Sequence, residues 1–209
     1  MYVFMNAELS GFNSDASLVS LGCVAETGEK LYIEFMDVPK YLMIPEVAEY
    51  VLPDTYIYSM SMDEGLELGN KAAEDHGYKY YVLCKGHAAA VLTAWFKSLL
   101  KDDHKGERIQ LVSYLCHYDV VHFFNLFQGQ FPYKLLVPYC YDLFNDAITD
   151  MDHSEGKFSL QNRIENALKC NFEEYAQNYY KVDIPDYDKK HALYLAEIIK
   201  NVWTNIYVI

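Results

Sequence analysis

The chain has 209 residues and a formal net charge of −13, from 17 Lys and Arg against 30 Asp and Glu. This charge excludes an overall basic stripe of the kind that grips long nucleic acid, but it leaves short oligonucleotides, nucleotides and protein partners open. The apolar fraction of 52% excludes intrinsic disorder and suits a single domain, residues 1–209, with a full core.

The first predicted elements are three short apolar or alternating segments, which we expect to pair as an antiparallel meander. Polar turn residues follow the first segment, and Thr-Gly-Glu at 27–29 joins the second to the third as a hairpin. The three predicted strands cover residues 2–6, 17–26 and 30–38.

The central part of the chain has the weakest pattern, and we expect residues 39–85 to be a family-specific insertion. Prolines interrupt its first half. In its second half, 62–77 has a helical pattern and 78–84 predicts a short strand.

Strands and helices alternate after this insertion. Residues 86–102 have apolar side chains at helical spacing, and 108–117 predict a buried strand that leads into a helix at 119–129. Further on, we predict a strand and short helix at 134–148, helices at 159–169 and 172–180, and a loop followed by a long helix at 183–206. The order predicts one α/β domain, in which helices flank a mixed sheet made of the meander and further strands.

The five cysteines lie far apart and form no CxxC pair, so we expect reduced thiols in a cytoplasmic protein. The N-terminus has no basic start followed by a long apolar segment, and the sequence nowhere has about 18 consecutive apolar residues. We therefore expect neither secretion nor a membrane-spanning segment.

The segment VFMNAELSGFN, residues 3–13, carries the first candidate site. Asn6 and Glu8 are two positions apart on the first predicted strand, so their side chains point to the same side of the sheet. Acid pairs in this arrangement commonly hold metal ions, but here the first partner is an amide.

Three motifs together resemble those of a known family. The first is AELSGF after the first strand, the second is HYD at the end of a later strand, and the third is HALYLA in the last helix. In this order the chain resembles the ribonuclease H-like 3′–5′ exonucleases of the DEDD type, the proofreading and RNA-trimming group. The resemblance implies a ribonuclease H-like fold, two-metal phosphodiester hydrolysis and a homodimer.

The resemblance also assigns the four acids and the general base of the family, position by position. The Asp-x-Glu motif falls on Asn6 and Glu8, and the second Asp falls on Asp119. In the last helix the closing Asp lands on Leu195, and the general-base His lands on Lys190. Two acids of four remain, and we predict metal ligands at Asn6, Glu8 and Asp119.

Half of the ligand charge for a two-metal centre is therefore missing. Two Mg²⁺ or Mn²⁺ ions normally need carboxylates, and each missing charge costs about 4 kcal/mol at close range and an effective dielectric near 20. Loss of the base puts a further ~10²–10⁴ in rate at risk. We expect Mg²⁺ or Mn²⁺ only if the protein is active, and otherwise no cofactor.

Other residues offer ways to complete the site, or structural explanations for what remains. His191 lies one helical turn before Leu195 and is the candidate replacement base, although a partly buried ring near the old cleft is the blander interpretation. Asp186 and Asp188 precede the last helix as candidate ligands or caps. Asp119 is also a good helix N-cap in its own right.

A short cluster and one residue of the last helix complete the set of candidates. His117, Asp119 and His122 lie within about one helical turn and form a weak candidate for a lone metal site. Glu197 lies about 200° round the last helix from Leu195, and we expect it to face away from the site.

We therefore predict an exonuclease-family domain with a degenerate site, non-catalytic or weakly active, whose catalytic candidates are Glu8, Asp119 and His191. Its cleft is expected to bind a nucleotide, the end of a short single-stranded nucleic acid or a protein partner. One alternative is an active metal-dependent 3′–5′ exonuclease with a rearranged or engineered site. The other is an acidic, Tyr-rich adaptor that binds a protein or mimics nucleic acid.

Overall fold

The structure is a computed structural model, which describes residues 1–11, 15–100, 106–114, 116–143, 172–187, 189 and 191–207. Six strands form one sheet in the order β4-β3-β2-β1-β5-β6. The strands are β1 (Tyr2–Leu9), β2 (Leu18–Ala25), β3 (Lys30–Phe35), β4 (Lys79–Leu83), β5 (Ile109–Ser113) and β6 (Leu136–Asp142). The α-helices are α1 (Pro45–Tyr50), α2 (Met62–His76), α3 (Lys85–Leu99), α4 (Cys116–Asn125), α7 (Phe172–Tyr180) and α8 (Ala192–Tyr207), and the 3-10 helices are η1 (Lys40–Leu42) and η2 (Leu52–Asp54).

The sheet is mixed, as the order of the predicted elements requires. β1 pairs antiparallel with β2, and β2 pairs antiparallel with β3, which confirms the predicted meander. β5 lies parallel to β1, β6 lies parallel to β5, and β4 lies parallel to β3 at the opposite edge. The α/β class is therefore confirmed, whereas the ribonuclease H-like topology stays a prediction.

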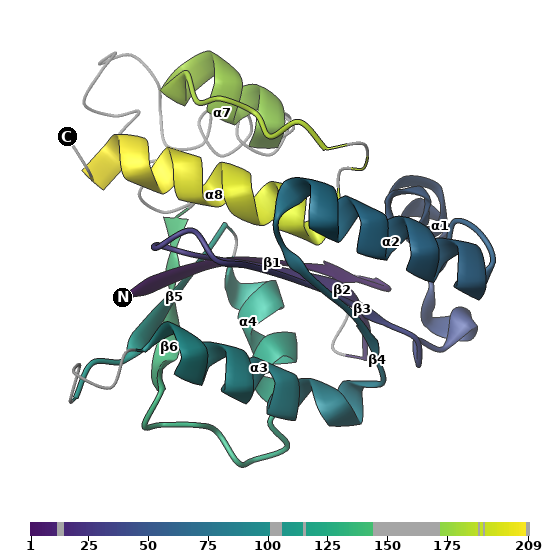
Figure 1. The fold of residues 1–209 in the computed structure, drawn as a ribbon, viewed down its shortest axis with the longest axis horizontal. Coiled ribbons are helices and arrows are strands. Elements are labelled where there is room, and N and C mark those ends of the chain that lie inside the picture. Colours follow the sequence, from purple (N-terminus) through teal and green to yellow (C-terminus); the bar gives the residue numbers. More distant parts are fainter. Residues whose placement is uncertain are drawn as a thin grey trace.

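Helices cover both faces of this sheet (Figure 1). α8 lies with α2 and α7 over one face, and α3 and α4 lie over the other. α8 packs on β1 and β2 because its apolar side chains recur every three or four residues and form one stripe. The buried members of this stripe are Ala192, Leu193, Ala196, Ile199, Val202 and Trp203.

Several predicted boundaries differ from those in the structure. β1 continues past residue 6 to Leu9, so Glu8 lies inside the strand. β3 ends at Phe35 rather than at residue 38, and α4 begins at Cys116, before the predicted start at 119. The helix predicted at 159–169 lies outside the described residues.

The expectations about thiols and membranes can be compared with the described part of the chain. Four of the cysteines, Cys23, Cys84, Cys116 and Cys140, are free of disulfide bonds there, and Cys170 lies outside it. Within the same residues, every helix is too short or too polar to cross a bilayer.

The predicted insertion extends the sheet. α2 begins at a capping box, in which Ser61 and Glu64 each accept a hydrogen bond from the other's backbone N–H. Gly77 ends the helix in a left-handed conformation, with φ of 69°, and β4 then adds the edge strand beside β3. The helix and the strand predicted in this region are confirmed.

Glu34, a buried residue on β3, ties this insertion to the sheet. Its carboxylate accepts hydrogen bonds from the backbone N–H groups of Tyr56 (2.7 Å) and Ile57 (2.9 Å). The hydroxyls of Tyr32 (2.7 Å) and Tyr80 (3.0 Å) donate to it as well. Burial raises the pKa of Glu34, and these donors oppose the rise. Because a buried charge without partners is costly, the donors fix the segment after η2 on the sheet.

α8 approaches β2 most closely at Gly22. A Cβ atom at this position would lie 2.3 Å from the backbone nitrogen of Leu193 and 2.4 Å from the carbonyl carbon of Ala192. Backbone atoms cannot swing aside as the end of a flexible side chain can. Only glycine therefore permits the observed distance between helix and sheet.

Gly22→Ala is expected to lower the free energy of unfolding by about 3 kcal/mol, since the added methyl group forces α8 away from β2. Gly86→Ala is the matched control, because a Cβ at Gly86 in α3 meets nothing within 4 Å. Alanine there should be neutral or stabilising by up to about 1 kcal/mol. Urea unfolding followed by circular dichroism measures both changes, and similar effects of the two substitutions would contradict the close approach.

Candidate functional site

The structure brings the first two predicted site residues together on β1. The Asn6 amide donates a hydrogen bond to the Glu8 carboxylate, with 3.3 Å between Nδ2 and Oε1. This contact fits the two-residue period of a strand. The amide orients the carboxylate but adds no negative charge that a metal ion would need.

Asp119 is buried on α4, with 8% of its surface exposed. The Ser113 hydroxyl donates to Asp119 Oδ2 at 2.8 Å, and the backbone N–H of Ala7 donates to the same carboxylate. The N-cap expectation is wrong, because α4 begins at Cys116 and Asp119 lies inside its first turn. The two hydrogen bonds instead hold Asp119 against β5 and β1, where its charge acts on Glu8.

Both carboxyl groups bind protons more tightly than free acids do. Burial, followed by the charge of Asp119, raises the pKa of Glu8 from 4.5 to about 8, while the Asn6 amide opposes the rise. Burial and the charge of Asp142 raise the pKa of Asp119 from 3.8 to about 7, although its hydrogen bonds lower it. Acids that repel each other in this way attract a cation or a proton.

Glu8 lines a pocket of about 180 Å³, which we call the acidic pocket. Its lining comes from β1, β2, residues 50–55, α7 and the start of α8. Leu195 belongs to this lining, so a hydrocarbon side chain shares the pocket with Glu8. The resemblance places the closing Asp of the family at this position.

Two further carboxylates line the acidic pocket, and the sequence motifs pointed to neither. Asp54 comes from the end of η2, and its charge contributes to the raised pKa of Glu8. Glu173 lies in the first turn of α7 and accepts a hydrogen bond from the Tyr194 hydroxyl. Both come from segments far from Glu8 in sequence, so only the tertiary fold brings them to it.

His191 also lines the acidic pocket, but it is 2% exposed and surrounded by aromatic rings. Its ring stacks on that of Tyr32, with 4.2 Å between centroids and 19° between planes. Burial lowers the pKa of His191 from 6.5 to about 3, so the ring is neutral near pH 7. Nδ1 accepts the backbone N–H of Tyr194 at 3.4 Å. A base this weak gives little driving force for taking a proton from water.

His191 Nε2 is buried and has no hydrogen-bond partner among the described residues. A buried polar atom without a partner is unusual, and His191 belongs to the lining of the acidic pocket. The blander prediction, a partly buried ring near the cleft, agrees with the packing of His191.

The described residues contain no group of three or more His, Cys, Asp or Glu side chains arranged to hold a metal ion. Mg²⁺ or Mn²⁺ binding by Asn6, Glu8 and Asp119 therefore stays a prediction. Of the alternative ligands, Asp186 is exposed and does not line the acidic pocket, and Asp188 lies outside the described residues.

The remaining candidates lie elsewhere. His122 lines a different pocket, which it shares with Lys85, and the side chain of His117 lies outside the described part. Glu197 forms an ion pair with Lys30, with 2.6 Å between Oε1 and Nζ, and it does not line the acidic pocket, as its helical position predicted.

Comparison with known proteins gives no further support for a family. The sequence matches no protein-family model, and no curated protein is significantly similar to it. The exonuclease resemblance thus depends on the three motifs and on the geometry around Glu8.

Because the pKa of Glu8 is raised, this group makes the stability of the folded chain decrease as the pH rises. The folded chain holds a proton on Glu8 up to about pH 8, whereas an unfolded chain loses it near 4.5. The stability that comes from this proton is complete below 4.5 and is lost as the pH rises through about 8.

Glu8→Gln should therefore have the same free energy of unfolding as the wild type near pH 4.5 and a higher one near pH 8. Glutamine imitates the protonated carboxyl group and cannot ionise. Urea unfolding of both proteins at these two pH values measures the difference in free energy of unfolding. Groups that do not interact with Glu8 titrate alike in both proteins, so their contributions cancel. A difference that does not change with pH would contradict the raised pKa of Glu8.

The His191 ring is expected to stay neutral throughout the neutral range and to protonate only near pH 3. Carbon–proton NMR spectra of the histidine rings, assigned through His191→Phe, follow this titration directly. Protonation of His191 near the ordinary value of about 6.5 would contradict its burial among the tyrosines.

Proposed function

We propose that this chain is a ribonuclease H-like domain of the 3′–5′ exonuclease type whose metal site has eroded and which binds rather than cleaves. One observation carries the proposal. Glu8 and Asp119 lie close enough to raise the pKa of Glu8, while Leu195 lines the same pocket as Glu8. Two matching acids thus meet at one place, next to a hydrocarbon where the resemblance requires a third acid.

The energetic case against two-metal hydrolysis rests on charge. Two divalent cations bring four positive charges, and Glu8 with Asp119 supplies at most two negative ones. Each absent charge costs about 4 kcal/mol at contact distance and an effective dielectric near 20. Leu195 offers no oxygen, and neutral His191 is a weak base.

The lining of the acidic pocket favours some ligands over others. Near neutral pH, where Glu8 holds its proton, Asp54 and Glu173 repel a phosphate group that arrives without a metal ion. The same carboxylates accept hydrogen bonds from a basic side chain or from the uncharged end of a nucleoside. We infer that the pocket takes such a group, presented by a protein partner or by the end of a short nucleic acid.

A second function is favoured by Asp54 and Glu173. These carboxylates lie in the pocket of Glu8 and restore the number of acids that the motifs lack. Their presence supports the alternative of an active exonuclease with a rearranged site. In that case Mn²⁺-dependent trimming would disappear in both Asp54→Asn and Glu173→Gln.

The test combines an activity assay with restoration of the lost ligands. The wild type is expected to leave 3′-labelled single-stranded DNA and RNA intact with Mg²⁺ or Mn²⁺. The double variant Asn6→Asp/Leu195→Asp should bind Mn²⁺ at least tenfold more tightly, which is about 1.4 kcal/mol, because one carboxylate returns beside Glu8 and another enters the acidic pocket. Isothermal titration calorimetry measures this affinity.

Asn6→Asp/Thr204→Asp is the matched control, since it adds the same two negative charges and Thr204 lies exposed on α8 outside the acidic pocket. It should gain less Mn²⁺ affinity than the first double variant. Equal affinities in the two double variants, or wild-type trimming that Glu8→Ala abolishes, would overturn the proposal.

A further inference from the structure

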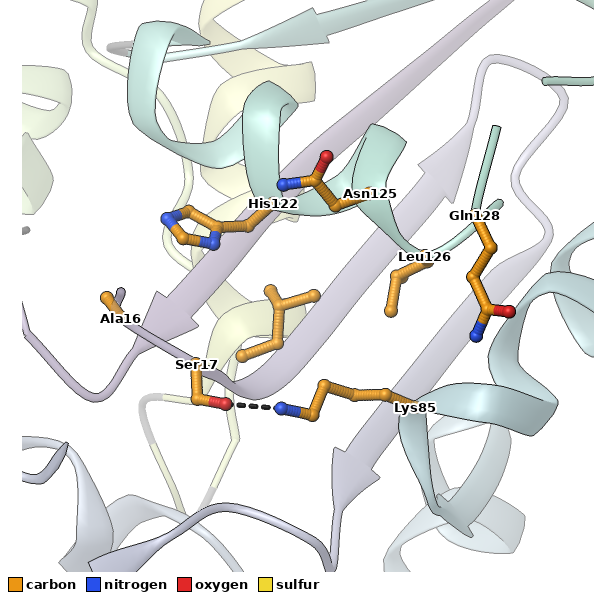
Figure 2. A pocket seen from close by; sticks show the side chains of 8 residues that line it. Ala16, Ser17, Lys85, His122, Asn125, Leu126 and Gln128 are labelled. Atoms are coloured by element: carbon orange, nitrogen blue, oxygen red, sulfur yellow. Dashed lines mark hydrogen bonds between the residues drawn. The ribbon is translucent and has the colours of Figure 1, made fainter. Parts of the chain in front are cut away.

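A second pocket, of about 200 Å³, lies where the start of β2, the first turn of α3 and the end of α4 meet (Figure 2). We call it the donor pocket, because its polar lining consists of Ser17, Lys85, His122, Asn125 and Gln128. Each of these side chains carries a hydrogen-bond donor, and none is acidic. No residue belongs to both pockets, so the donor pocket is a separate place on the molecule.

Lys85 supplies the fixed positive charge of the donor pocket. Its ammonium group donates to the Ser17 hydroxyl across the pocket, as Figure 2 shows. Within the described ranges the Lys85 side chain forms no ion pair. The Asp37 carboxylate accepts hydrogen bonds from the Lys85 backbone N–H, at 3.1 and 3.2 Å, and not from its ammonium group. It thus provides an acceptor for a free N–H group at the N-terminus of α3. The positive charge of Lys85 is therefore available to a ligand in the pocket, as far as the described residues show.

His122 shares the electrostatic environment of Lys85. Burial and the positive charge of Lys85 lower the pKa of His122, so its ring is a neutral hydrogen-bond partner near pH 7. The groups that face this ring are therefore Lys85 from α3 and the uncharged side chains of Ser17 and Asn125. Among the lining residues that the structure describes, none is acidic, so none of them cancels this positive potential.

The backbone at the end of α4 directs Gln128 over the donor pocket. Gln128 has φ of 47°, a left-handed conformation that costs a residue other than glycine about 1 kcal/mol. Its amide points down towards the helix that carries Lys85 (Figure 2). Strain of this kind is common where a side chain must be presented to a ligand.

We propose that the donor pocket binds a phosphate group, either free or carried by a small phosphomonoester. An ammonium group and several neutral donors suit the oxygens of a tetrahedral anion, and Lys85 provides the charge that holds it. This inference does not depend on the proposed function, because it concerns residues outside the acidic pocket.

The test is an NMR titration of the ¹⁵N-labelled full chain at constant ionic strength. Inorganic phosphate and a nucleoside monophosphate are titrated in separate arms, with chloride as the reference anion. We expect saturable changes in the backbone amide chemical shifts, centred on Lys85, His122 and Gln128, in at least one arm. If inorganic phosphate saturates the site, the free anion is sufficient for binding. If only the nucleotide saturates it, the ligand is a phosphomonoester.

Lys85→Met should weaken this binding by about tenfold or more, because the positive charge that Lys85 gives to the pocket is lost. Lys97→Met is the matched control, since Lys97 lies exposed on the same helix and the variant has the same net charge. Asn125→Asp, at an exposed position, should also weaken binding by placing a negative charge at the pocket, and it guards against a folding defect in Lys85→Met.

Three results would overturn the inference. They are the absence of saturation in both arms, shifts that centre away from the donor pocket, and equal losses in Lys85→Met and Lys97→Met. None of them bears on Mn²⁺ binding at Glu8, so the two proposals can fail separately.

Discussion

The shape of the candidate site depends on the hydrogen bonds that the buried carboxylate of Glu34 accepts. A carboxylate inside a protein is stable only where donors surround it. Glu34 obtains its donors from β3 itself, from β4 and from the segment after η2. Because the backbone N–H groups of Tyr56 and Ile57 must reach it, η2 is drawn over the sheet. Asp54 and Thr55 then become part of the acidic pocket.

The same contact extends through aromatic rings to α8. Tyr32 donates to Glu34 and stacks on His191, the residue immediately before α8. The start of that helix is thus held from one side by the rings and from the other by its close approach to Gly22. Leu195, one turn into α8, takes its place in the pocket as a result. Burial of His191 follows from packing, and its low pKa follows from that burial.

Local patterns in the sequence were sufficient for the elements but not for the site. Strand alternation and the helical spacing of apolar side chains involve residues a few positions apart, so the meander and the helices α2 and α8 were predicted. The pairing of Asn6 with Glu8 was predictable for the same reason. Asp54 and Glu173 reach the pocket only through contacts between distant segments, which leave no periodic signal. The N-cap alternative for Asp119 was wrong, because a capping residue and a buried acid in the first turn look alike in sequence.

Net charge describes this protein poorly at the scale of its pockets. Free ions screen exposed charges beyond about 8 Å at physiological ionic strength, so the potential inside a hollow is governed by its own lining. Asp54 and Glu173 make one pocket negative, whereas Lys85 makes the other positive within a chain of charge −13. α4 contributes to both regions, with Asp119 in its first turn against β1 and His122 further along the helix beside Lys85. The acidic balance therefore argues against a long polyanion on the whole surface, but it does not argue against one phosphate at one place.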